Sequence, residues 1–217
     1  MLLQILVFGP PLVLAVILHE VAHGVCALRL GDPTAKVLGR LSLNPLKHVD
    51  YLMTLVLPGL LIISGSPVVF GGAKPVPINP SYFKNPRVGM MYVAACGPIT
   101  NFILAALAAL LLNWSELDPL LLQLGTMTGS LIKSWIVAGF FINLVLGLFN
   151  LIPVPPLDGG RIAVGLLPLR LARRLAKVEP YGILLVFILL LSGLFARTLE
   201  PLLQFTARWL VPGLDLP

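Results

Sequence analysis

The sequence predicts an all-α, polytopic membrane protein, a bundle of about four to six transmembrane helices. Of its 217 residues, 58% are hydrophobic and only 11% are charged, whereas a soluble domain carries roughly 25% charged residues. Apolar runs long enough to cross a ~30 Å hydrocarbon core, which takes about 20 residues of helix, recur along the chain. Lys and Arg gather in the short loops between these runs, as in loops on the inner side of a membrane. The net charge of +6 therefore reflects membrane topology, and we expect no nucleic-acid partner.

The first half of the chain predicts one span and a re-entrant segment. Residues 3–29 form a long apolar run that predicts the first transmembrane helix, and residues 34–50 read as a loop. Residues 51–66 are apolar but short, and Pro58-Gly59 interrupts them, which favours a re-entrant hairpin over a full span. Residues 67–87 contain repeated prolines, which block helix and favour a membrane-associated extended or edge-strand segment.

The second half predicts further spans with alternating loop charge. Residues 88–113 and 130–152 are clear apolar spans, and the segment that follows the first of them, to about residue 126, is acidic and is predicted to face outward. The polar stretch after residue 152 holds five basic residues and is predicted to face the cytoplasm. A fourth span covers about 180–197, and residues 199–213 form either a short interfacial helix or a last imperfect span.

The first span contains the pattern HExxH, in His19-Glu20-Val21-Ala22-His23. Residues four apart lie one helical turn apart on the same face, so both imidazoles can reach one metal ion. Glu20, about 100° round the helix from His19, can then deprotonate a water that the metal activates. Unpaired polar side chains in a membrane helix each cost on the order of 2–3 kcal/mol, and a metal would give all three a partner. The alternative is an ion or proton path, which would make the protein a transporter.

Asp158 is the candidate for a third ligand, because two histidines leave a zinc site short of its usual three protein ligands. It follows the third clear span, where prolines break the helix and expose backbone around the carboxylate. Non-helical backbone at membrane depth is tolerated where it lines a cavity. The prolines and glycines alone would equally explain a helix stop with an interfacial Asp, so the residues themselves leave both interpretations open.

Three motifs recur in order along the chain: HEVAH at 19–23, GPITN at 97–101 and NLIPVPPLDGG at 150–160. Together they resemble the site-2 protease family, most closely its compact bacterial branch without PDZ or CBS modules, and the resemblance covers roughly residues 15–165. It implies an intramembrane zinc metalloprotease that hydrolyses peptide bonds within or near the transmembrane segments of membrane-anchored proteins. We accordingly expect one domain over residues 1–217, with a catalytic core at about 3–165 and C-terminal helices beyond it.

The resemblance also implies roles for individual residues. Carried onto matching positions, it makes His19, His23 and Asp158 the ligands of one Zn²⁺ per chain and Glu20 the general base. Three further side chains, Asn101, Asn150 and His48, are candidates to bind substrate or stabilise the oxyanion. The alternative for the two asparagines is hydrogen bonding between helices, and for His48 a solvated turn.

Loop charge predicts where the site lies in the membrane. If the basic residues of 29–47 face inward, HExxH lies in the cytoplasmic half of the first span, and Asp158 adjoins a second basic segment at similar depth. Both reach one side only if the first and third clear spans are parallel, with one crossing between them. That crossing is residues 88–113, so 51–66 should not cross. We expect a multi-pass protein of a bacterial plasma membrane with its active site towards the cytoplasm.

Overall fold

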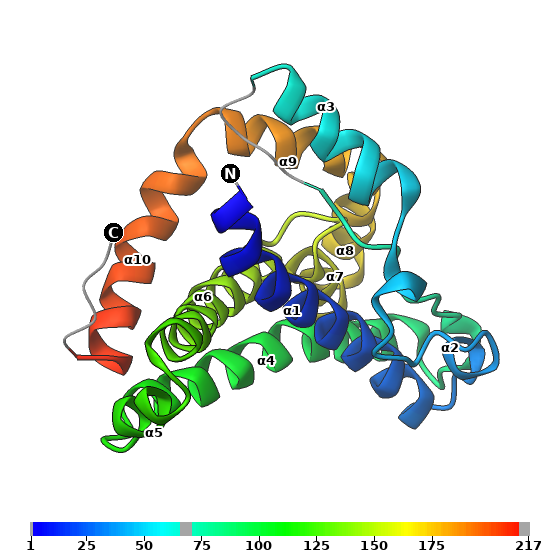
Figure 1. Cartoon of the computed structure of the whole chain (residues 1–217). Coiled ribbons are helices and arrows are strands. Elements are labelled where there is room, and N and C mark those ends of the chain that lie inside the picture. Colours follow the sequence, from blue (N-terminus) through cyan, green and yellow to red (C-terminus); the bar gives the residue numbers. More distant parts are fainter. Residues whose placement is uncertain (1, 66–70, 213–217) are drawn as a thin grey trace.

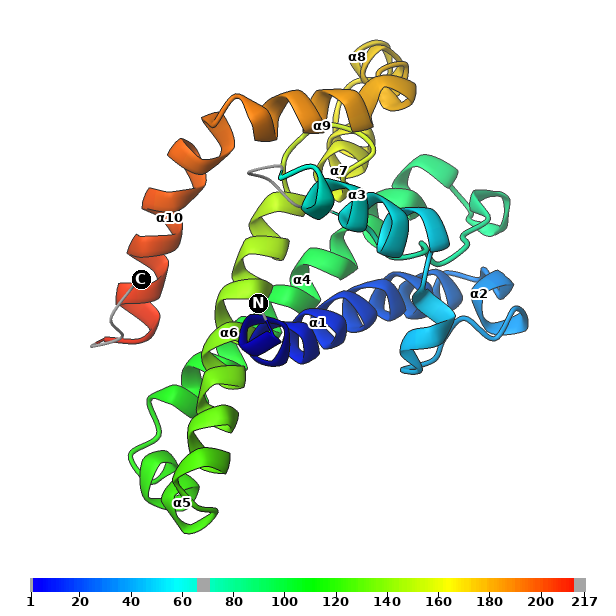
Figure 2. The same cartoon turned by 45° about the horizontal axis from the view of Figure 1, so that its top comes forward.

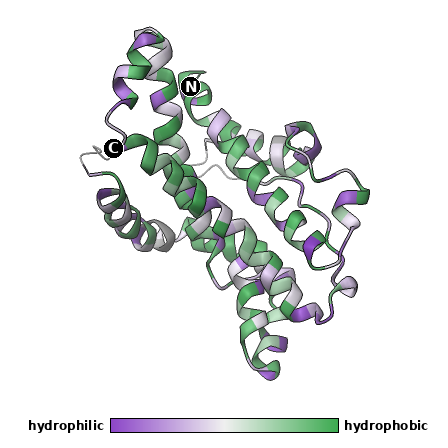
Figure 3. Ribbon diagram, turned by 90° about the horizontal axis from the view of Figure 1, so that it is seen from below, coloured by the Kyte–Doolittle hydropathy of each residue, from purple (hydrophilic) through white to green (hydrophobic). Residues whose placement is uncertain are grey.

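The structure, a computed structural model, describes residues 2–65 and 71–212, and its described part consists of helices and irregular segments without a strand (Figure 1). Figure 3 shows hydrophobic residues along much of the helical ribbon. Four short helical turns are η1 (Pro45–His48), η2 (Tyr51–Val56), η3 (Pro80–Tyr82) and η4 (Glu179–Tyr181). The α-helices are α1 (Leu2–Arg29), α2 (Thr34–Val37), α3 (Leu57–Ile63), α4 (Pro86–Leu112), α5 (Leu117–Gln123), α6 (Thr126–Asn150), α7 (Asp158–Leu166), α8 (Leu169–Ala176), α9 (Gly182–Leu191) and α10 (Leu194–Leu210).

Three helices of the described part, α1, α4 and α6, are long and apolar enough to cross a membrane. They pack against one another at the centre of the molecule (Figure 1). On α1 and α4 the residue order runs in opposite directions, since His23 contacts Val93 while His19, nearer the N-terminus, contacts Asn101. Trp135, early on α6, contacts Leu6, early on α1, whereas Asn143, later on α6, contacts the Asn101 that His19 contacts. The predicted parallel course of the first and third clear spans, with α4 running the opposite way, is therefore observed.

The parallel packing of α1 on α6 uses a carbonyl that a proline sets free. Pro10 lies inside α1 and has no N–H, so the carbonyl of Leu6 loses its helical hydrogen bond. The indole N–H of Trp135 on α6 donates to that carbonyl at 2.8 Å. The proline thus leads to a fixed contact between two spans, because a backbone carbonyl in lipid needs a hydrogen-bond donor from within the protein.

The segment predicted as a fourth span, residues 180–197, is not one helix. Gly193 adopts a left-handed conformation with φ of 69° and separates α9 from α10, which meet at a bend in Figure 2. This is a common way for a helix to end, because glycine meets no Cβ penalty there. α9 has 10 residues and α10 has 17, so each is shorter than the roughly 20 residues of a full span.

Residues 51–63 form one helical stretch, and the predicted interruption at Pro58-Gly59 is wrong. Pro58 lies in the first turn of α3, where its missing N–H costs little. The chain nevertheless comes back to where the stretch begins: Gly72 donates its N–H to the carbonyl of Met53 at 3.0 Å, and Lys74 donates to that of His48 at 2.8 Å. Entry and exit therefore lie side by side, as in a re-entrant segment. Residues 66–70, which join them in the chain, lie outside the described range.

Residues 71–79 run without helix or strand pairing across the end of α1. Their carbonyls are held in part by Arg40, whose guanidinium donates to Lys74 at 2.8 Å and to Pro75 at 3.3 Å. The non-helical character predicted for residues 67–87 is confirmed for 71–79, whereas η3 and the first residues of α4 are helical, and residues 67–70 lie outside the described range. The described residues of this segment form no edge strand.

Candidate functional site

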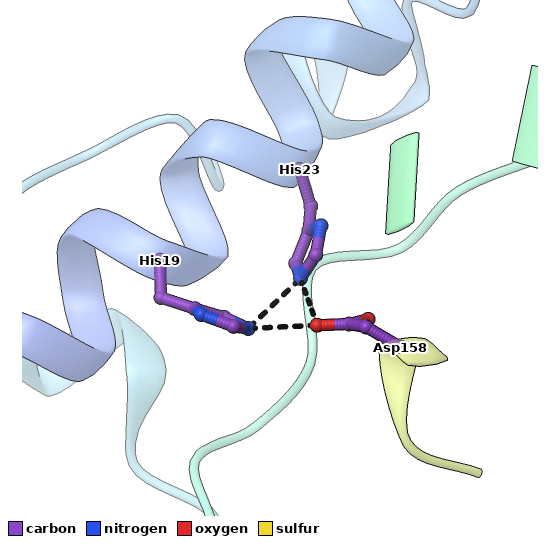
Figure 4. A group of neighbouring side chains, drawn as sticks. All are labelled: His19, His23 and Asp158. Carbon is purple, nitrogen blue, oxygen red and sulfur yellow. Dashed lines mark hydrogen bonds and ion pairs between the residues drawn. The ribbon is translucent and has the colours of Figure 1, made fainter. Parts of the chain in front are cut away.

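Three side chains converge between α1 and the start of α7 (Figure 4). The Nε2 atoms of His19 and His23 lie 3.0 Å apart. Oδ2 of Asp158 lies 3.1 Å from the first of these nitrogens and 3.3 Å from the second. All three residues are 7% exposed. The HExxH helix and the segment after the third span, 135 residues later in the chain, are thus brought to one point.

The hydrogen bonds around the two imidazoles decide what this point can bind. Nδ1 of His23 faces the carbonyl of Val93 at 2.7 Å, and Nδ1 of His19 faces Oδ1 of Asn101. Both partners are acceptors, so each Nδ1 carries the proton of a neutral imidazole and each Nε2 presents a lone pair. Two lone pairs and a carboxylate oxygen therefore face one another, an arrangement that a cation between them would stabilise.

The donor set fits zinc. Bonds of about 2.0–2.1 Å in tetrahedral geometry place ligand atoms about 3.3 Å apart, close to the separations observed. Oδ2 of Asp158 is buried and accepts no hydrogen bond from any described residue, which is costly for a carboxylate oxygen without a cation. Two histidines and one carboxylate are also one of the common three-ligand sets of a catalytic zinc, which leave the fourth position open.

Asn101 lies behind His19 and does not line the cavity at the site. It is fully buried, its Oδ1 accepts from His19, and its amide group donates to Oδ1 of Asn143 at 2.8 Å. Asn143 in turn donates to the carbonyl of Gly139 at 2.8 Å. The predicted role of Asn101 towards substrate or oxyanion therefore has no support in the geometry; its amide fixes the orientation and tautomer of a ligand histidine.

Gly97, the first residue of GPITN, provides the space that the histidines occupy. A Cβ atom at this position would lie 2.5 Å from the ring of His23 and 2.6 Å from that of His19. Real Cβ atoms do not approach this closely, so α4 can carry only glycine where it crosses the two rings. Sequence reasoning missed this role, and it also missed Asn143, although a polar residue in an apolar span was a signal that it has a partner.

Glu20 lines the same cavity, of about 240 Å³, on the side of residues 71–79. Its Oε2 accepts the backbone N–H of Val76 at 2.8 Å. The bond uses one oxygen and holds the carboxylate beside the two histidines, so the second oxygen is available to a water or a substrate group. The non-helical segment thus positions the residue predicted to act as the base.

The segment from 71 to 79 is anchored at its far end by Asp32, a residue that sequence analysis did not single out. Asp32 is completely buried and accepts hydrogen bonds from the backbone of Asn79 at 2.7 Å and from the backbone and hydroxyl of Thr34. Burial raises the pKa of this carboxyl, but the bonds from Thr34 and Asn79 outweigh it and lower the pKa below its ordinary value. Asp32 is therefore an anionic anchor for the segment over the site.

Asp158 begins α7 after a proline-rich turn, as predicted. Gly159 directly follows it because a Cβ there would collide with the carbonyls of Leu151 and Ile152. Asn150 lines the cavity, as its predicted role requires, but its amide donates to the carbonyl of Leu146 at 3.0 Å. A substrate contact by Asn150 would have to replace that bond.

His48 is not brought to the site. It is buried at 3% exposed, its Nε2 donates to the carbonyl of Ser42 at 2.7 Å, and its own carbonyl accepts from Lys74. It does not line the cavity that contains Glu20. The predicted substrate role is therefore not supported by its position, and the alternative of a solvated turn is not met either, because the side chain is buried. The imidazole holds the loop before η2 together through Ser42, and the backbone carbonyl of His48 joins this loop to the segment after α3.

Comparisons with known proteins find relatives of this chain. The model of Peptidase family M50 matches residues 8–193. YwhC of Bacillus subtilis, named as a candidate zinc metalloprotease, is 37% identical over 195 residues, which cover 89% of this chain and 84% of YwhC. Rip2 of Mycolicibacterium smegmatis, named in the same way, is 32% identical over 83% of this chain, and Rip2 of Mycobacterium tuberculosis is 30% identical over 81%. These matches span 64% and 62% of the Rip2 proteins. No solved structure matches the chain significantly.

Proposed function

We propose that this chain, which belongs to peptidase family M50, the site-2 protease family, and is a membrane zinc metalloprotease, hydrolyses peptide bonds within or near the transmembrane segments of membrane-anchored proteins. The observation that carries the proposal is the position of the triad. His19, His23 and Asp158 are buried between helices whose outer surfaces are apolar. A protein embedded in the same bilayer has its peptide bonds at the depth of such a site, which favours a membrane-anchored substrate over a soluble one.

In this proposal His19 and His23 donate their Nε2 lone pairs to zinc, and Asp158 supplies the third ligand through Oδ2. Bound zinc supplies Lewis-acid chemistry, lowering the pKa of a water and polarising the scissile carbonyl. Glu20 takes the proton from the attacking water and returns it to the leaving amine. Asn101 and the carbonyl of Val93 keep both imidazoles in the tautomer that ligation needs.

Substrate binding requires an extended chain, because a helical substrate hides its carbonyls in its own hydrogen bonds. We infer that the substrate unwinds locally and lies against residues 71–79, where strand addition would satisfy its freed backbone groups. Support comes from the lining of the cavity, in which Pro75, Val76 and Ile78 appear together with the triad.

The proposal places the site towards the cytoplasm of a bacterial cell. Arg29 ends α1 and Arg87 lies in the first turn of α4, so the ends of both spans nearest to the triad are basic. The relatives named above are bacterial proteins, which fits a bacterial plasma membrane.

The test is Glu20→Gln in the purified full-length protein. The amide keeps the shape of the side chain and can still accept the N–H of Val76, so fold and zinc content should remain. Cleavage should fall by at least about 100-fold, since general-base catalysis contributes roughly 10²- to 10⁴-fold. Residual activity above about 1% would point to another base.

The same variant identifies substrates and tests the transporter alternative. Membrane proteins that accumulate as uncleaved stubs in cells carrying Glu20→Gln, and not in wild-type cells, are the expected substrates. An ion flux that disappears in this variant, with no stub accumulating, would contradict the proposal and favour a proton path.

A further inference from the structure

A second cavity, of about 590 Å³, adjoins the one that contains the triad. The two share part of their lining: Pro75, Val76, Ile78, Met90 and Arg161 border both. The larger cavity continues past the first turn of α4 towards α7 and α8, with Arg87 and Ala176 in its wall. It therefore extends from the catalytic cavity towards the basic end of the spans.

Arg161 stands at the junction of these cavities. It follows Asp158 by three residues on α7, so the two side chains share a helix face. Its guanidinium contacts Glu179, in the wall of the larger cavity, through one N–O distance of 3.4 Å. The side chains are 40% and 50% exposed, and a long, single, half-exposed ion pair contributes little stability. The guanidinium of Arg161 can therefore exchange Glu179 for another carboxylate at little cost in free energy.

The charge of this wall is biased towards a negative occupant. Arg87 also lines the cavity and donates to the carbonyl of Leu167 at 3.0 Å, a neutral partner, and no described carboxylate forms an ion pair with it. Glu179 is the acidic residue among the lining residues. A substrate carboxylate would meet two guanidinium groups and compete with one resident acid, whereas a substrate lysine would meet two like charges.

We propose that this second cavity is a specificity subsite that takes an acidic side chain of the substrate, next to the scissile bond on the water-facing side, and that Arg161 binds its carboxylate in place of Glu179. The inference rests on the proposed function, because it assumes a polypeptide that passes the triad. Arginine suits the task, since its planar fork binds a carboxylate through two parallel hydrogen bonds.

The experiment uses purified, zinc-loaded, full-length protein and three series of variants of one transmembrane model substrate. In the first series Glu, in the second Gln and in the third Lys replaces each residue within four positions of the scissile bond, one at a time. The value of kcat/KM is measured for every substrate. The wild type should cleave the Glu substrate about fivefold faster than the Gln substrate at one position on the water-facing side, the upper range for a partly exposed ion pair, with Lys slowest. No preference at any position would overturn the proposal.

Two variants and a control test whether Arg161 and Glu179 cause the preference for a Glu substrate over a Gln substrate. Arg161→Gln should reduce the Glu-to-Gln ratio to about one while the Gln substrate is still cut. Glu179→Gln should raise the ratio above wild type, because the competing carboxylate is gone. Arg170→Gln, an exposed residue on α8 outside both cavities, should leave it unchanged.

Failure of this inference and failure of the proposed function are distinguishable. If the wild type cuts the Gln substrate and Arg161→Gln keeps the preference for Glu, the subsite assignment is wrong and the protease function stands. If Arg161→Gln does not fold, the ratio of Glu179→Gln decides, and an unchanged ratio refutes the assignment. A wild-type protein that cuts no membrane substrate refutes the function itself.

Discussion

Gly97→Ala is the smallest change that tests how the site is built. The added methyl carbon would lie 2.5 Å from His23 and 2.6 Å from His19, where ordinary contacts between carbon atoms are about 3.5–4.0 Å. Each ring would have to move by roughly 1 Å. Neither can do so freely, because Asn101 and the carbonyl of Val93 hold their Nδ1 atoms.

Two opposing terms set the magnitude. Alanine favours a helix over glycine by about 1 kcal/mol, whereas forcing an extra carbon into a packed interior typically costs 1–3 kcal/mol. We therefore expect a change in unfolding free energy between about zero and 2 kcal/mol of destabilisation. The effect on the metal should be larger, because displaced ligands lower affinity by at least the 10- to 100-fold lost when their supporting residues are changed.

Gly139→Ala is the matched control. Gly139 lies in α6, and a Cβ there would meet nothing nearer than Pro11, at 3.9 Å. Zinc per chain is measured by elemental analysis, with wild type at one and the His19→Ala, His23→Ala double variant as the metal-free reference. Gly139→Ala should keep zinc and cleavage and Gly97→Ala should lose both. A Gly97→Ala protein with full zinc and wild-type cleavage would refute the close approach of α4 to the two rings.

Two further predictions follow from the site and the topology. Asn101→Ala should weaken zinc binding by about 10- to 100-fold in competition with a chelator, because His19 loses the acceptor that fixes its tautomer; unchanged affinity would mean that the bond does not matter for ligation. Single cysteines at the exposed positions of Lys36 and Lys74, in a background without the native cysteines, should both resist a membrane-impermeant reagent until cells are permeabilised, and labelling of position 74 alone from outside would show that residues 51–66 cross.

The three long spans were predictable because each is a continuous apolar run in the sequence. Apolar runs at 3–29, 88–113 and 130–152 correspond to α1, α4 and α6 within a few residues, because burying helical backbone in lipid requires continuous apolar sequence. Two predictions about where helices begin and end were wrong. Gly193 ended a helix inside an apolar run, and Pro58 failed to end one because it fell in a first turn. The average hydrophobicity of a segment does not show whether a single glycine or proline lies at the end, in the first turn or in the middle of a helix.

By itself the sequence determined the three long spans α1, α4 and α6. It also placed His19, Glu20 and His23 about one turn apart on a single helix, because the spacing of residues along a helix is fixed by backbone geometry. Only the tertiary structure decided which partners face them. In the structure Asn101 bonds the Nδ1 atom of a ligand histidine, His48 lies outside the catalytic cavity, and Arg161 lines both cavities. The direction of a side chain across a helix contact depends on how neighbouring helices approach and rotate, and that is set by packing among residues far apart in the chain.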